Sequence, residues 1–485
     1  MTIPKEIKNI VGEIRKEGFE AYLVGGCIRD LLRKEKPKDW DIATNAKPNQ
    51  IEKIFPKSFS DNKFGTVTVL TGSKTSSLKE IEITPYRAEE QYSDKRHPDK
   101  IRWVQKIEKD LSRRDFTINA IAADLKDSDL EFIDPFKGQE DLKKKVIKTV
   151  GKPEQRFSED ALRIVRAVRL AVVLGFSIEP KTKKAIKENA SWLKAISKER
   201  IRDELMKIVM SEDASQGIAL LRELGLLKHI IPELEEGYEV SQNKHHIYDC
   251  YEHSLKSLDY AAKQGFNKYV RLAALLHDVG KPRSKEGEGE DATFYNHEII
   301  GAKMASRILE KLKFSKKDIE KVVKLVRYHL FYYNVGEVSE SSVRRLVRKV
   351  GVESMEELIQ VRMADRIGSG VPKAEPYKLR HLKYLVEKVS RDPISVKKLK
   401  VSGDDVIKIT GAKPGPKIGQ ILDILLGYVI ADPKKNNKKF LEGEIEELSK
   451  LSDKELEKEA SQAREKRDEI EMKKDRMTKK KYWVS

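Results

Sequence analysis

The sequence contains little cysteine and no long apolar run, and both absences restrict what the protein can be. Only Cys27 and Cys250 occur in 485 residues, and they form no paired motif. A secreted domain held together by disulfide bonds is therefore not expected, and a reduced cytoplasm fits the composition better. No apolar run approaches membrane-spanning length, and residues 1–18 predict an amphipathic helix rather than a signal peptide. We expect a soluble, cytoplasmic protein with no membrane partner.

Positive charge is what the chain has in excess. Its 97 lysines and arginines outnumber 79 aspartates and glutamates, giving a formal net charge of +18 and an isoelectric point near 9.4. A basic chain can be merely soluble, but this balance favours a polyanionic partner. We expect that partner to be RNA, and we expect no DNA partner. The length allows about three domains, each able to bury its own core.

Two aspartates near the start of the chain form the first candidate site. Residues 21–44 run from an apolar segment through two glycines and a polar stretch to Asp39 and Asp41. Residues two apart in a strand point to the same face, so both carboxylates could share divalent metal ions while Trp40 packs on the other side. Two Mg²⁺ ions held in this way would activate an attacking hydroxyl and neutralise a leaving pyrophosphate.

Two glycines precede this pair and suit a phosphate ligand. Gly25 and Gly26 follow the apolar strand expected at residues 22–24. They would let backbone amides approach a triphosphate closely, with Arg29 one helical turn further on. Taken alone, the glycines could form a simple turn and the aspartates could be solvated loop residues. Their order within one short segment favours a metal-dependent nucleotidyl-transfer site.

The next segments predict the rest of a small mixed sheet. Residues 65–70 and 80–87 alternate as strands do. Glu82 and Thr84 would share a face, so Glu82 is either a third carboxylate beside the metals or an exposed strand residue. Residues 86–104 are polar and have no clean period, which predicts a loop over the site.

A basic cluster follows in residues 110–120. Arg113 and Arg114 stand before Asp115 and Asn119. These residue types are suited to binding phosphate and ribose at the end of a helix. In isolation, the same residues would favour a surface cluster of ion pairs.

Residues 158–176 predict one amphipathic helix, capped by Ser158. An aspartate and several arginines recur along it at three-residue steps. Aspartate offers hydrogen-bond acceptors, and arginine offers a rigid fork of donors. A protein that recognises the edge of cytosine or adenine without a nucleic-acid template needs both. Ordinary ion pairing on a wet helix face, worth a few tenths of a kcal/mol, is the alternative. The polar series is Asp160, Arg163, Arg166 and Arg169, and the apolar stripe is Ile164, Val165, Val168 and Val172.

These three motifs resemble those of the class II tRNA nucleotidyltransferases, the CCA-adding enzymes of the poly(A) polymerase superfamily. The resemblance implies template-independent addition of CMP, CMP and AMP, from CTP and ATP, to the 3′ end of tRNA. It implies that Asp39 and Asp41 hold Mg²⁺, and that residues 86–104 are the flexible loop thought to help the switch from CTP to ATP. The nucleotide-binding residues that it implies are Gly26, Arg29, Arg114, Asp160, Arg163, Arg166 and Arg169.

Histidines concentrate further along the chain, beyond Asn243. Imidazoles and carboxylates recur on separate predicted helices, and both groups are common metal ligands. Their order resembles the HD phosphohydrolase superfamily, and every expected ligand position is filled. The resemblance implies a divalent transition metal or Mg²⁺ and hydrolysis of a phosphoester, such as a terminal or 2′,3′-cyclic phosphate on RNA; a degenerate, structural HD domain is the alternative. The six positions are His253, His277, Asp278, His297, His329 and Asp365.

We therefore expect an α+β nucleotidyltransferase palm, a small mixed sheet with helices, followed by all-α neck and body, HD and tail domains. The helices after the palm would hold the tRNA acceptor arm through phosphate contacts. The last segment is rich in lysine and glutamate and predicts a solvated helix, which could form an RNA-binding tail or a frayed one. The expected ranges are 1–150 for the palm, 151–240 for the neck and body, 241–370 for the HD domain, 371–445 for a tRNA-binding module and 446–485 for the charged tail.

Three other functions share most of these motifs. The chain could add only the two cytidines or only the adenosine, although the loop at residues 86–104 argues against an adenosine-only enzyme. It could be a poly(A) polymerase, or an RNA phosphohydrolase with a vestigial transferase. The sequence makes no prediction of the oligomeric state.

Overall fold

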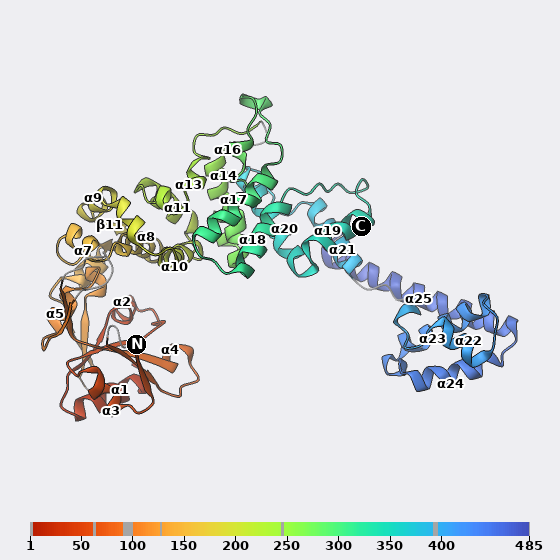
Figure 1. Ribbon diagram of the computed structural model, residues 1–485, viewed down its shortest axis with the longest axis horizontal. Helices are drawn as coiled ribbons and strands as arrows, with labels where there is room; N and C mark the ends of the chain where they lie inside the picture. The colour runs from red at the N-terminus through yellow and green to blue at the C-terminus, as the bar shows by residue number, and fades with distance from the viewer. Residues whose placement is uncertain are drawn as a thin grey trace. The chain divides into compact units, whose positions relative to one another are not determined.

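The computed structural model describes residues 3–61, 65–90, 100–126, 129–243, 247–390 and 396–484. The chain divides into two compact units. Unit 1 contains residues 1–330 and 360–372, and unit 2 contains residues 331–359 and 373–485. A sheet with helices makes up the start of the chain, and helices make up most of the remainder (Figure 1). The predicted fold class is therefore confirmed.

A seven-stranded mixed sheet forms the base of unit 1. Its strand order is β3-β4-β5-β2-β1-β8-β9, in which β2 and β5 run parallel and the other neighbours run antiparallel. The order places β2 and β5, which carry the predicted carboxylates, side by side at the centre. The strands are β1 (Ala21–Val24), β2 (Asp41–Thr44), β3 (Ser58–Asp61), β4 (Thr66–Leu70), β5 (Glu80–Pro85), β8 (Ala122–Lys126) and β9 (Asp129–Ile133).

One face of this sheet packs against helices α1 (Lys5–Lys16) and α3 (Pro48–Ile54). Leu23, Ile42 and Ile83 are fully buried in this core, together with Ile7 and Ile14 of α1. Side chains alternate across a strand, so the neighbours of Ile42 and Ile83 in sequence point to the opposite face. The predicted carboxylates lie on that opposite face.

Two further sheets have two strands each. Strand β6 (Arg87–Glu90) pairs antiparallel with β7 (Lys100–Trp103), and β10 (Val146–Ile147) pairs parallel with β11 (Ser177–Ile178). The prediction of a loop over residues 86–104 is therefore wrong at its two ends, which pair as strands despite their irregular pattern. Residues 91–99, the centre of that loop, lie outside the described residues.

The segment predicted as one helix from Ser158 to residue 176 forms two. Helix α7 (Pro153–Glu159) ends before Asp160, whose backbone is extended, and α8 (Leu162–Leu174) follows. Ala161 is the N-cap residue of α8, and the Leu162 amide donates to Asp160 Oδ1 at 3.1 Å, so Ser158 does not cap this helix. The predicted apolar stripe of α8 is buried.

Helices form most of the rest of unit 1. They include two layers that later carry the histidines, α14 packed on α15 and α17 packed on α18. The helices are α2 (Gly26–Leu32), α4 (Ser76–Lys79), α5 (Ile107–Ser112), α6 (Gly138–Lys143), α9 (Pro180–Glu188), α10 (Lys198–Val209), α11 (Ala214–Glu223), α12 (Leu227–Ile230), α13 (Pro232–Glu235), α14 (Cys250–Lys263), α15 (Lys268–Leu276), α16 (Lys281–Ser284), α17 (His297–Lys311) and α18 (Lys316–Tyr328). Short 3-10 helices occur at Thr117–Asn119, Ala190–Ala195 and Gly289–Asp291.

Unit 2 is helical, and its last helix is packed along one side. Leu456 and Ala460 of α25 are fully buried against α23, and Asp475 accepts a hydrogen bond from Tyr384 of α21 at 2.6 Å. The predicted helix is present, but the frayed tail is not. The helices are α19 (Glu340–Val350), α21 (Tyr377–Ser390), α22 (Gly403–Thr410), α23 (Pro416–Ala431), α24 (Lys438–Ser449) and α25 (Asp453–Tyr482), with 3-10 turns at Val396–Lys398 and Pro433–Lys435.

Helix α20 (Val352–Gly368) begins in unit 2 and ends in unit 1, where it supplies residues to the second site described below. Among the described residues, no helix combines the length and the apolar character needed to cross a membrane.

Candidate functional site

A cavity of about 610 Å³ lies on the polar face of the large sheet. It is lined by β1, β2 and β5, by the start of α2, by residues 113–119 and by α8. The structure thus brings together segments that lie far apart in the sequence. All nine residues predicted for the transferase site line it, as does Glu82: Gly26, Arg29, Asp39, Asp41, Glu82, Arg114, Asp160, Arg163, Arg166 and Arg169.

Three carboxylates share one wall of this cavity. Asp41 opens β2 and lies directly opposite Glu82 of β5, while Asp39 precedes the strand and was wrongly predicted to lie within it. Trp40 is buried in the core, as predicted. Burial, Asp39 and Glu82 raise the pKa of Asp41 to about 6, although Arg114 opposes them. Carboxylates crowded in this way favour a bound cation, and hard divalent ions such as Mg²⁺ prefer oxygen ligands.

The two glycines leave the space in front of these carboxylates open. Gly25 has a φ of +76°, and a Cβ atom there would lie 3.1 Å from Arg114 Nη1 and 3.4 Å from Asp41 Oδ2. A Cβ atom on Gly26 would lie 3.7 Å from Asp39 Oδ1. Only glycine adopts the Gly25 conformation without strain and also leaves this volume free for a ligand.

Two arginines reach the same space and are held by buried acceptors. Arg29 Nη1 donates to Asn119 Oδ1 at 2.8 Å, and Arg114 Nη2 donates to Asp110 Oδ2 at 3.1 Å. Asp110 is fully buried, and although burial would raise its pKa, Arg113 and Arg114 lower it. The Nε atom of Arg114 is buried and has no hydrogen-bond acceptor among the described residues. The Nη1 end of the same guanidinium lies beside Gly25 and lines the cavity.

Asp160 lies at the break between α7 and α8 and is held by Arg200 of α10. The two guanidinium nitrogens of Arg200 donate to the two Asp160 oxygens at 3.2 and 2.8 Å. This bidentate pair fixes the plane of the carboxylate in the cavity wall. Arg200 was missed by sequence reasoning because it is 40 residues away and follows no spacing rule.

Arg163, the second residue predicted to read the base, is also fixed. Its side chain is largely buried, and it donates to Glu159 Oε2 at 2.8 Å and to the carbonyls of Arg156 and Arg113 at 3.1 and 2.9 Å. A guanidinium with three acceptors has little freedom to turn. Its geometry in the cavity is therefore set before any ligand arrives.

The next two arginines of α8 pair with buried acids. Arg166 Nε donates to Asp115 Oδ2 at 2.9 Å, and Arg169 Nε lies 2.8 Å from Glu204 Oε2 of α10. Burial would raise the pKa of Asp115, but Arg166 and Arg163 lower it to about 2. These residues support one another and the cavity wall. Glu204 was missed by sequence reasoning because its partner lies on another helix.

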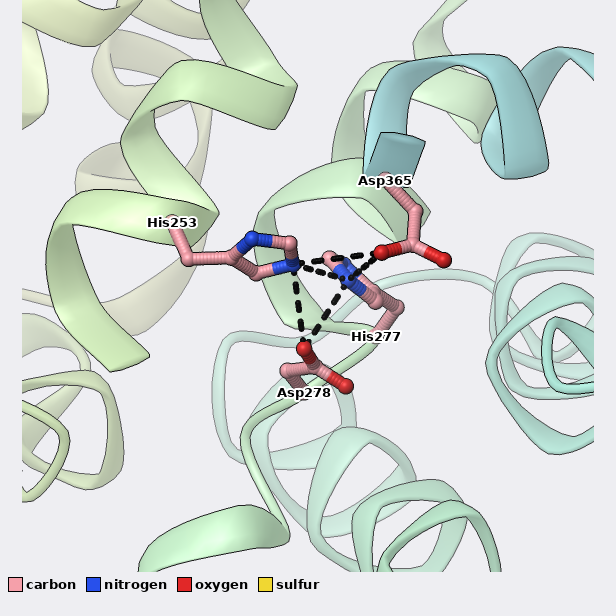
Figure 2. Close-up of side chains that lie close together, drawn as sticks. All are labelled: His253, His277, Asp278 and Asp365. Carbon is pink, nitrogen blue, oxygen red and sulfur yellow. Dashed lines mark hydrogen bonds and ion pairs between the residues drawn. The ribbon is translucent and has the colours of Figure 1, made fainter. Parts of the chain in front are cut away.

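A second cluster gathers all six predicted HD positions around one carboxylate, Asp278. Asp278 Oδ2 lies 3.0 Å from His253 Nε2 and 3.2 Å from His277 Nε2 (Figure 2). Asp278 Oδ1 lies 3.4 Å from His297 Nε2 and 3.5 Å from His329 Nε2. The carboxylate therefore faces one histidine pair with each of its oxygens.

Three of the four imidazoles are oriented by backbone carbonyls. The Nδ1 atoms of His277, His297 and His329 lie 2.9, 2.7 and 2.7 Å from the carbonyl oxygens of Ala274, Phe294 and Val326. Metal ligation requires a neutral imidazole, and with its one proton on Nδ1 the Nε2 lone pair would face a metal ion beside Asp278. Although burial lowers the pKa of His277, Asp278 and Asp365 raise it to about 10, so a bound metal ion would displace a proton from this imidazole. Metal-binding histidines are held in the same way.

The cluster fits two metal ions. Within the described residues, neither buried oxygen of Asp278 accepts a hydrogen bond of good geometry, although the Nε2 atoms surround them and Lys281 forms an ion pair with Oδ2. Asp365 completes the first set, with Oδ1 at 3.4 Å from His253 Nε2. The sets, each with ligand atoms within 4.8 Å of one another, are His253, His277, Asp278 and Asp365, and Asp278, His297 and His329.

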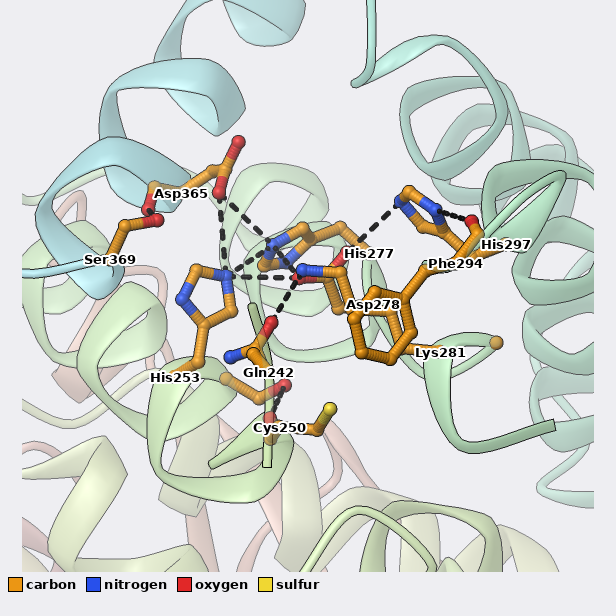
Figure 3. Close-up of polar contacts among 12 residues, drawn as sticks. Gln242, Cys250, His253, His277, Asp278, Lys281, Phe294, His297, Asp365 and Ser369 are labelled. Atoms are coloured by element: carbon orange, nitrogen blue, oxygen red, sulfur yellow. Dashed lines mark hydrogen bonds and ion pairs between the residues drawn. The ribbon is translucent and has the colours of Figure 1, made fainter. Parts of the chain in front are cut away.

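A lysine and a glutamine complete the surroundings of Asp278 (Figure 3). Lys281 Nζ lies 2.7 Å from Asp278 Oδ2 and donates to Gln242 Oε1 at 2.6 Å. Burial would raise the pKa of Asp278, but His277 and Lys281 hold it well below its ordinary value. Sequence reasoning missed Lys281, which stands three residues after the aspartate on the one-turn helix α16.

A second cavity of about 460 Å³ opens onto this cluster from the side of His297 and His329. One wall belongs to the end of α20, and another to the segment before α17. The lining residues are Asn243, Asp278, Lys281, Ala292, Thr293, Phe294, Tyr295, His297, His329, Leu330, Arg362, Asp365, Arg366, Ser369 and Val371.

Comparison with protein families divides the chain into three matches. Residues 21–148 match the poly A polymerase head domain, residues 175–237 match the probable RNA and SrmB-binding site of polymerase A, and residues 250–370 match the HD domain. The first match contains the carboxylate wall, and the third contains all six ligands of the histidine cluster.

Several curated proteins are similar over most of the chain. A CCA-adding enzyme of Ligilactobacillus salivarius is 34% identical over 91% of this chain and 99% of its own length. An A-adding tRNA nucleotidyltransferase of Deinococcus radiodurans is 32% identical over 84% of this chain and 90% of its own. A CCA-adding enzyme of Lactobacillus delbrueckii is 48% identical, but that match spans only 43% of this chain and half of the relative.

Solved structures give the same result. A crystal structure of the Bacillus stearothermophilus CCA-adding enzyme in complex with CTP aligns with 92% of this chain and 98% of its own. The TM-score is 0.60 and the sequence identity is 27%.

Proposed function

The chain belongs to the CCA-adding enzymes, and we propose that it adds CMP, CMP and AMP, taken from CTP and ATP, to the 3′ end of tRNA without a template. The observation that carries this proposal is a single cavity that joins the carboxylates of β2 and β5 to the arginine series of α8. The carboxylate wall would then carry out nucleotidyl transfer, and the wall formed by α8 would select the base.

Asp39 and Asp41 would hold Mg²⁺, with Glu82 as a third oxygen donor. The support is the crowding of like charges that raises the pKa of Asp41 to about 6. When bound, the ions supply a lowered pKa for the attacking 3′ hydroxyl and neutralise the leaving pyrophosphate. Arg114, whose Nη1 atom lies beside the space at Gly25, would contact the triphosphate, and Gly25 keeps the approach open.

Asp160 and Arg163 would choose the base. Aspartate accepts hydrogen bonds from an exocyclic amino group, which cytosine and adenine both carry, and arginine donates to a ring nitrogen or carbonyl. Both side chains are held by other residues, so their spacing stays fixed while the nucleotide changes. Arg166 and Arg169 would support this wall and contact phosphate.

The wider assignments follow from this function. The domain borders at residues 150, 240, 370 and 445 would separate the palm, the neck and body, the HD domain, the tRNA-binding module and the tail. The tRNA acceptor arm would lie on the basic helices of residues 151–240, and the reaction would take place in the cytoplasm. The excess of 97 basic over 79 acidic residues supports an RNA partner.

The test is a gel assay of the purified chain with Mg²⁺ and a tRNA that ends before its CCA. Two added nucleotides with CTP alone and three with CTP and ATP are expected, and the Asp41→Asn variant should add none. An arrest at two nucleotides would identify a cytidine-adding enzyme. Addition of one adenosine only to tRNA ending in CC would match the Deinococcus relative, and a long ladder with ATP alone would mean a poly(A) polymerase.

A second function, metal-dependent hydrolysis of a phosphoester, is favoured by the two ligand sets that share Asp278. Imidazole-rich sets favour a divalent transition metal, although Mg²⁺ remains the alternative. Metal ions held there would supply an activated water. His253 and His277 would hold one ion, His297 and His329 the other, and Asp365 would complete the first set. RNA with a terminal or 2′,3′-cyclic phosphate is the proposed substrate.

Metal analysis of the purified chain tests this second function. Two ions per chain are expected, one ion in a His297→Ala/His329→Ala variant, and none in Asp278→Asn. The matched control is Asp41→Asn, which should keep both tightly bound ions while losing nucleotide addition. Loss of nucleotide addition in a folded His277→Ala variant that still binds tRNA would contradict two separate sites.

A further inference from the structure

We propose that metal ions at the histidine cluster cross-link the two segments of unit 1 to which unit 2 is joined, and so restrain the chain where it enters and leaves unit 2. This conformational function rests on the proposed metal binding and is independent of the proposed hydrolysis. Through it, tRNA binding by the proposed module at residues 371–445, most of which lies in unit 2, would depend on these ions.

The path of the chain places the cluster at the crossings between the units. The first segment of unit 1 ends at Leu330, and its second segment, residues 360–372, lies in sequence between two parts of unit 2. His329 directly precedes the end of the first segment, and Asp365 lies near the middle of the second. Val371, next to the last crossing, lines the cavity that opens onto the cluster. The cluster thus takes one ligand from each segment that carries the chain into or out of unit 2.

The two ligand sets divide these segments between them. The set of Asp278, His297 and His329 includes the end of α18, and the other set includes Asp365 of α20 (Figure 2). The remaining ligands come from residues 253–297, inside unit 1. An ion in either set would therefore join one crossing segment to the rest of unit 1, so part of its binding energy would stabilise that attachment.

Close packing already holds the end of α20 against α14. A Cβ atom on Gly368 would overlap Ser257 Oγ and would lie 2.8 Å from the carbonyl oxygen of His253. Asp365, three residues before this glycine, faces His253 with Oδ1 at 3.4 Å from Nε2. The packing therefore brings the carboxylate to the imidazole, and an ion bound between them would oppose the separation of α20 from α14.

Thermodynamic linkage gives the size of the expected effect. If a crossing segment opens only after its ion has left, ion binding slows hydrogen exchange in that segment by a factor of one plus the ratio of free metal to Kd. The factor is about a hundred when the free metal concentration is about 100 times the Kd.

The experiment is hydrogen exchange, measured by mass spectrometry, on the full chain with and without Mn²⁺. An Asp39→Ala/Asp41→Ala background removes the other metal site. Mn²⁺ should slow exchange in residues 323–330 and 362–368 by up to about a hundredfold. Helix α1, which packs on the transferase sheet, is the internal reference and should not respond.

Two single changes separate the ligand sets, and each should leave one bound ion. In Mn²⁺, His297→Ala should restore fast exchange in residues 323–330 only, because it releases the ion shared with His329. His253→Ala should restore fast exchange in residues 362–368 only. Without metal, both variants should match the parent chain, which separates loss of an ion from loss of packing.

A chain that binds both ions without a change in exchange, a chain that binds none, or an identical response in the two variants would overturn the cross-link. The Kd for tRNA, measured in Mn²⁺ in the same background, should rise several-fold in either variant. If exchange responds as expected but the Kd for tRNA does not, the cross-link stands and the tRNA-binding role of residues 371–445 fails. If exchange responds and no phosphoester is hydrolysed, the cross-link stands and the proposed hydrolase fails.

Discussion

Arg200→Ala is the sharpest test of how the base is chosen, because this arginine holds Asp160 without lining the cavity itself. The pair is bidentate, at 3.2 and 2.8 Å, and the Arg200 and Asp160 side chains are 28% and 18% exposed. A charge-assisted contact contributes about 1.5–3 kcal/mol, and partial exposure places this pair near the lower limit. A loss of about 1.5–2 kcal/mol from the transition state corresponds to a fall of about 10–30-fold in kcat/KM.

The assay is single-nucleotide addition to tRNA lacking CCA, with CTP and UTP compared at equal concentration. Arg200→Ala should lower kcat/KM for CTP more than for UTP, because cytosine offers an amino group where uracil has a carbonyl. Arg202→Ala is the control, since Arg202 pairs with Asp203 on the same helix and does not line the cavity. Unchanged discrimination in Arg200→Ala, with Asp160→Ala defective, would refute the positioning role.

Three more changes probe the same cavity. Asp115→Asn removes a carboxylate whose pKa is about 2 instead of 3.8, because Arg166 lowers it against the effect of burial. This pKa shift contributes about 2 kcal/mol to the free energy of unfolding above pH ~4, and the contribution is lost as the pH falls towards 2. The difference in unfolding free energy between wild type and variant, measured in urea, should therefore shrink over that window, and a constant difference would contradict the pairing. Gly25→Ala should abolish nucleotide addition while tRNA binding persists, because the strained φ and a Cβ atom 3.1 Å from Arg114 act together; near-normal turnover would show that the space is not used. Asp110→Asn should raise KM for CTP about tenfold or more through loss of a buried charged acceptor, and an unchanged KM in a folded variant would exclude its role in holding Arg114.

Residues that act through short spacings could be predicted from the sequence. Asp39 and Asp41 are two residues apart, and His277 and Asp278 are adjacent, so each pair is placed by local geometry alone. Asp39 nevertheless lies before β2 rather than within it, and both aspartates still line the cavity. A prediction that misplaces the border of a strand or helix by one or two residues still places both members of such a pair in the same site.

The residues that hold the site in place could not be predicted in this way. Arg200 and Glu204 meet Asp160 and Arg169 only because α10 packs against α8, and no periodicity in either helix specifies that contact. The break before α8 lies at Asp160, whose backbone is extended and whose side chain accepts from the Leu162 amide. The helical pattern continues across it, so sequence reasoning joined two helices and placed Asp160 within a helix, whereas it lies between the two.

The charges of the transferase cavity explain why its ligands must arrive with metal ions. Its lining contains eight cationic and six carboxylate side chains, and most of the arginines are already paired with an acid or a carbonyl. Pairing fixes their geometry but leaves little net attraction for a triphosphate. The carboxylates of Asp39, Asp41 and Glu82 would in addition repel the phosphates. Divalent ions on that wall turn repulsion into attraction, so triphosphate affinity should depend on Mg²⁺ far more than the overall charge of +18 would suggest.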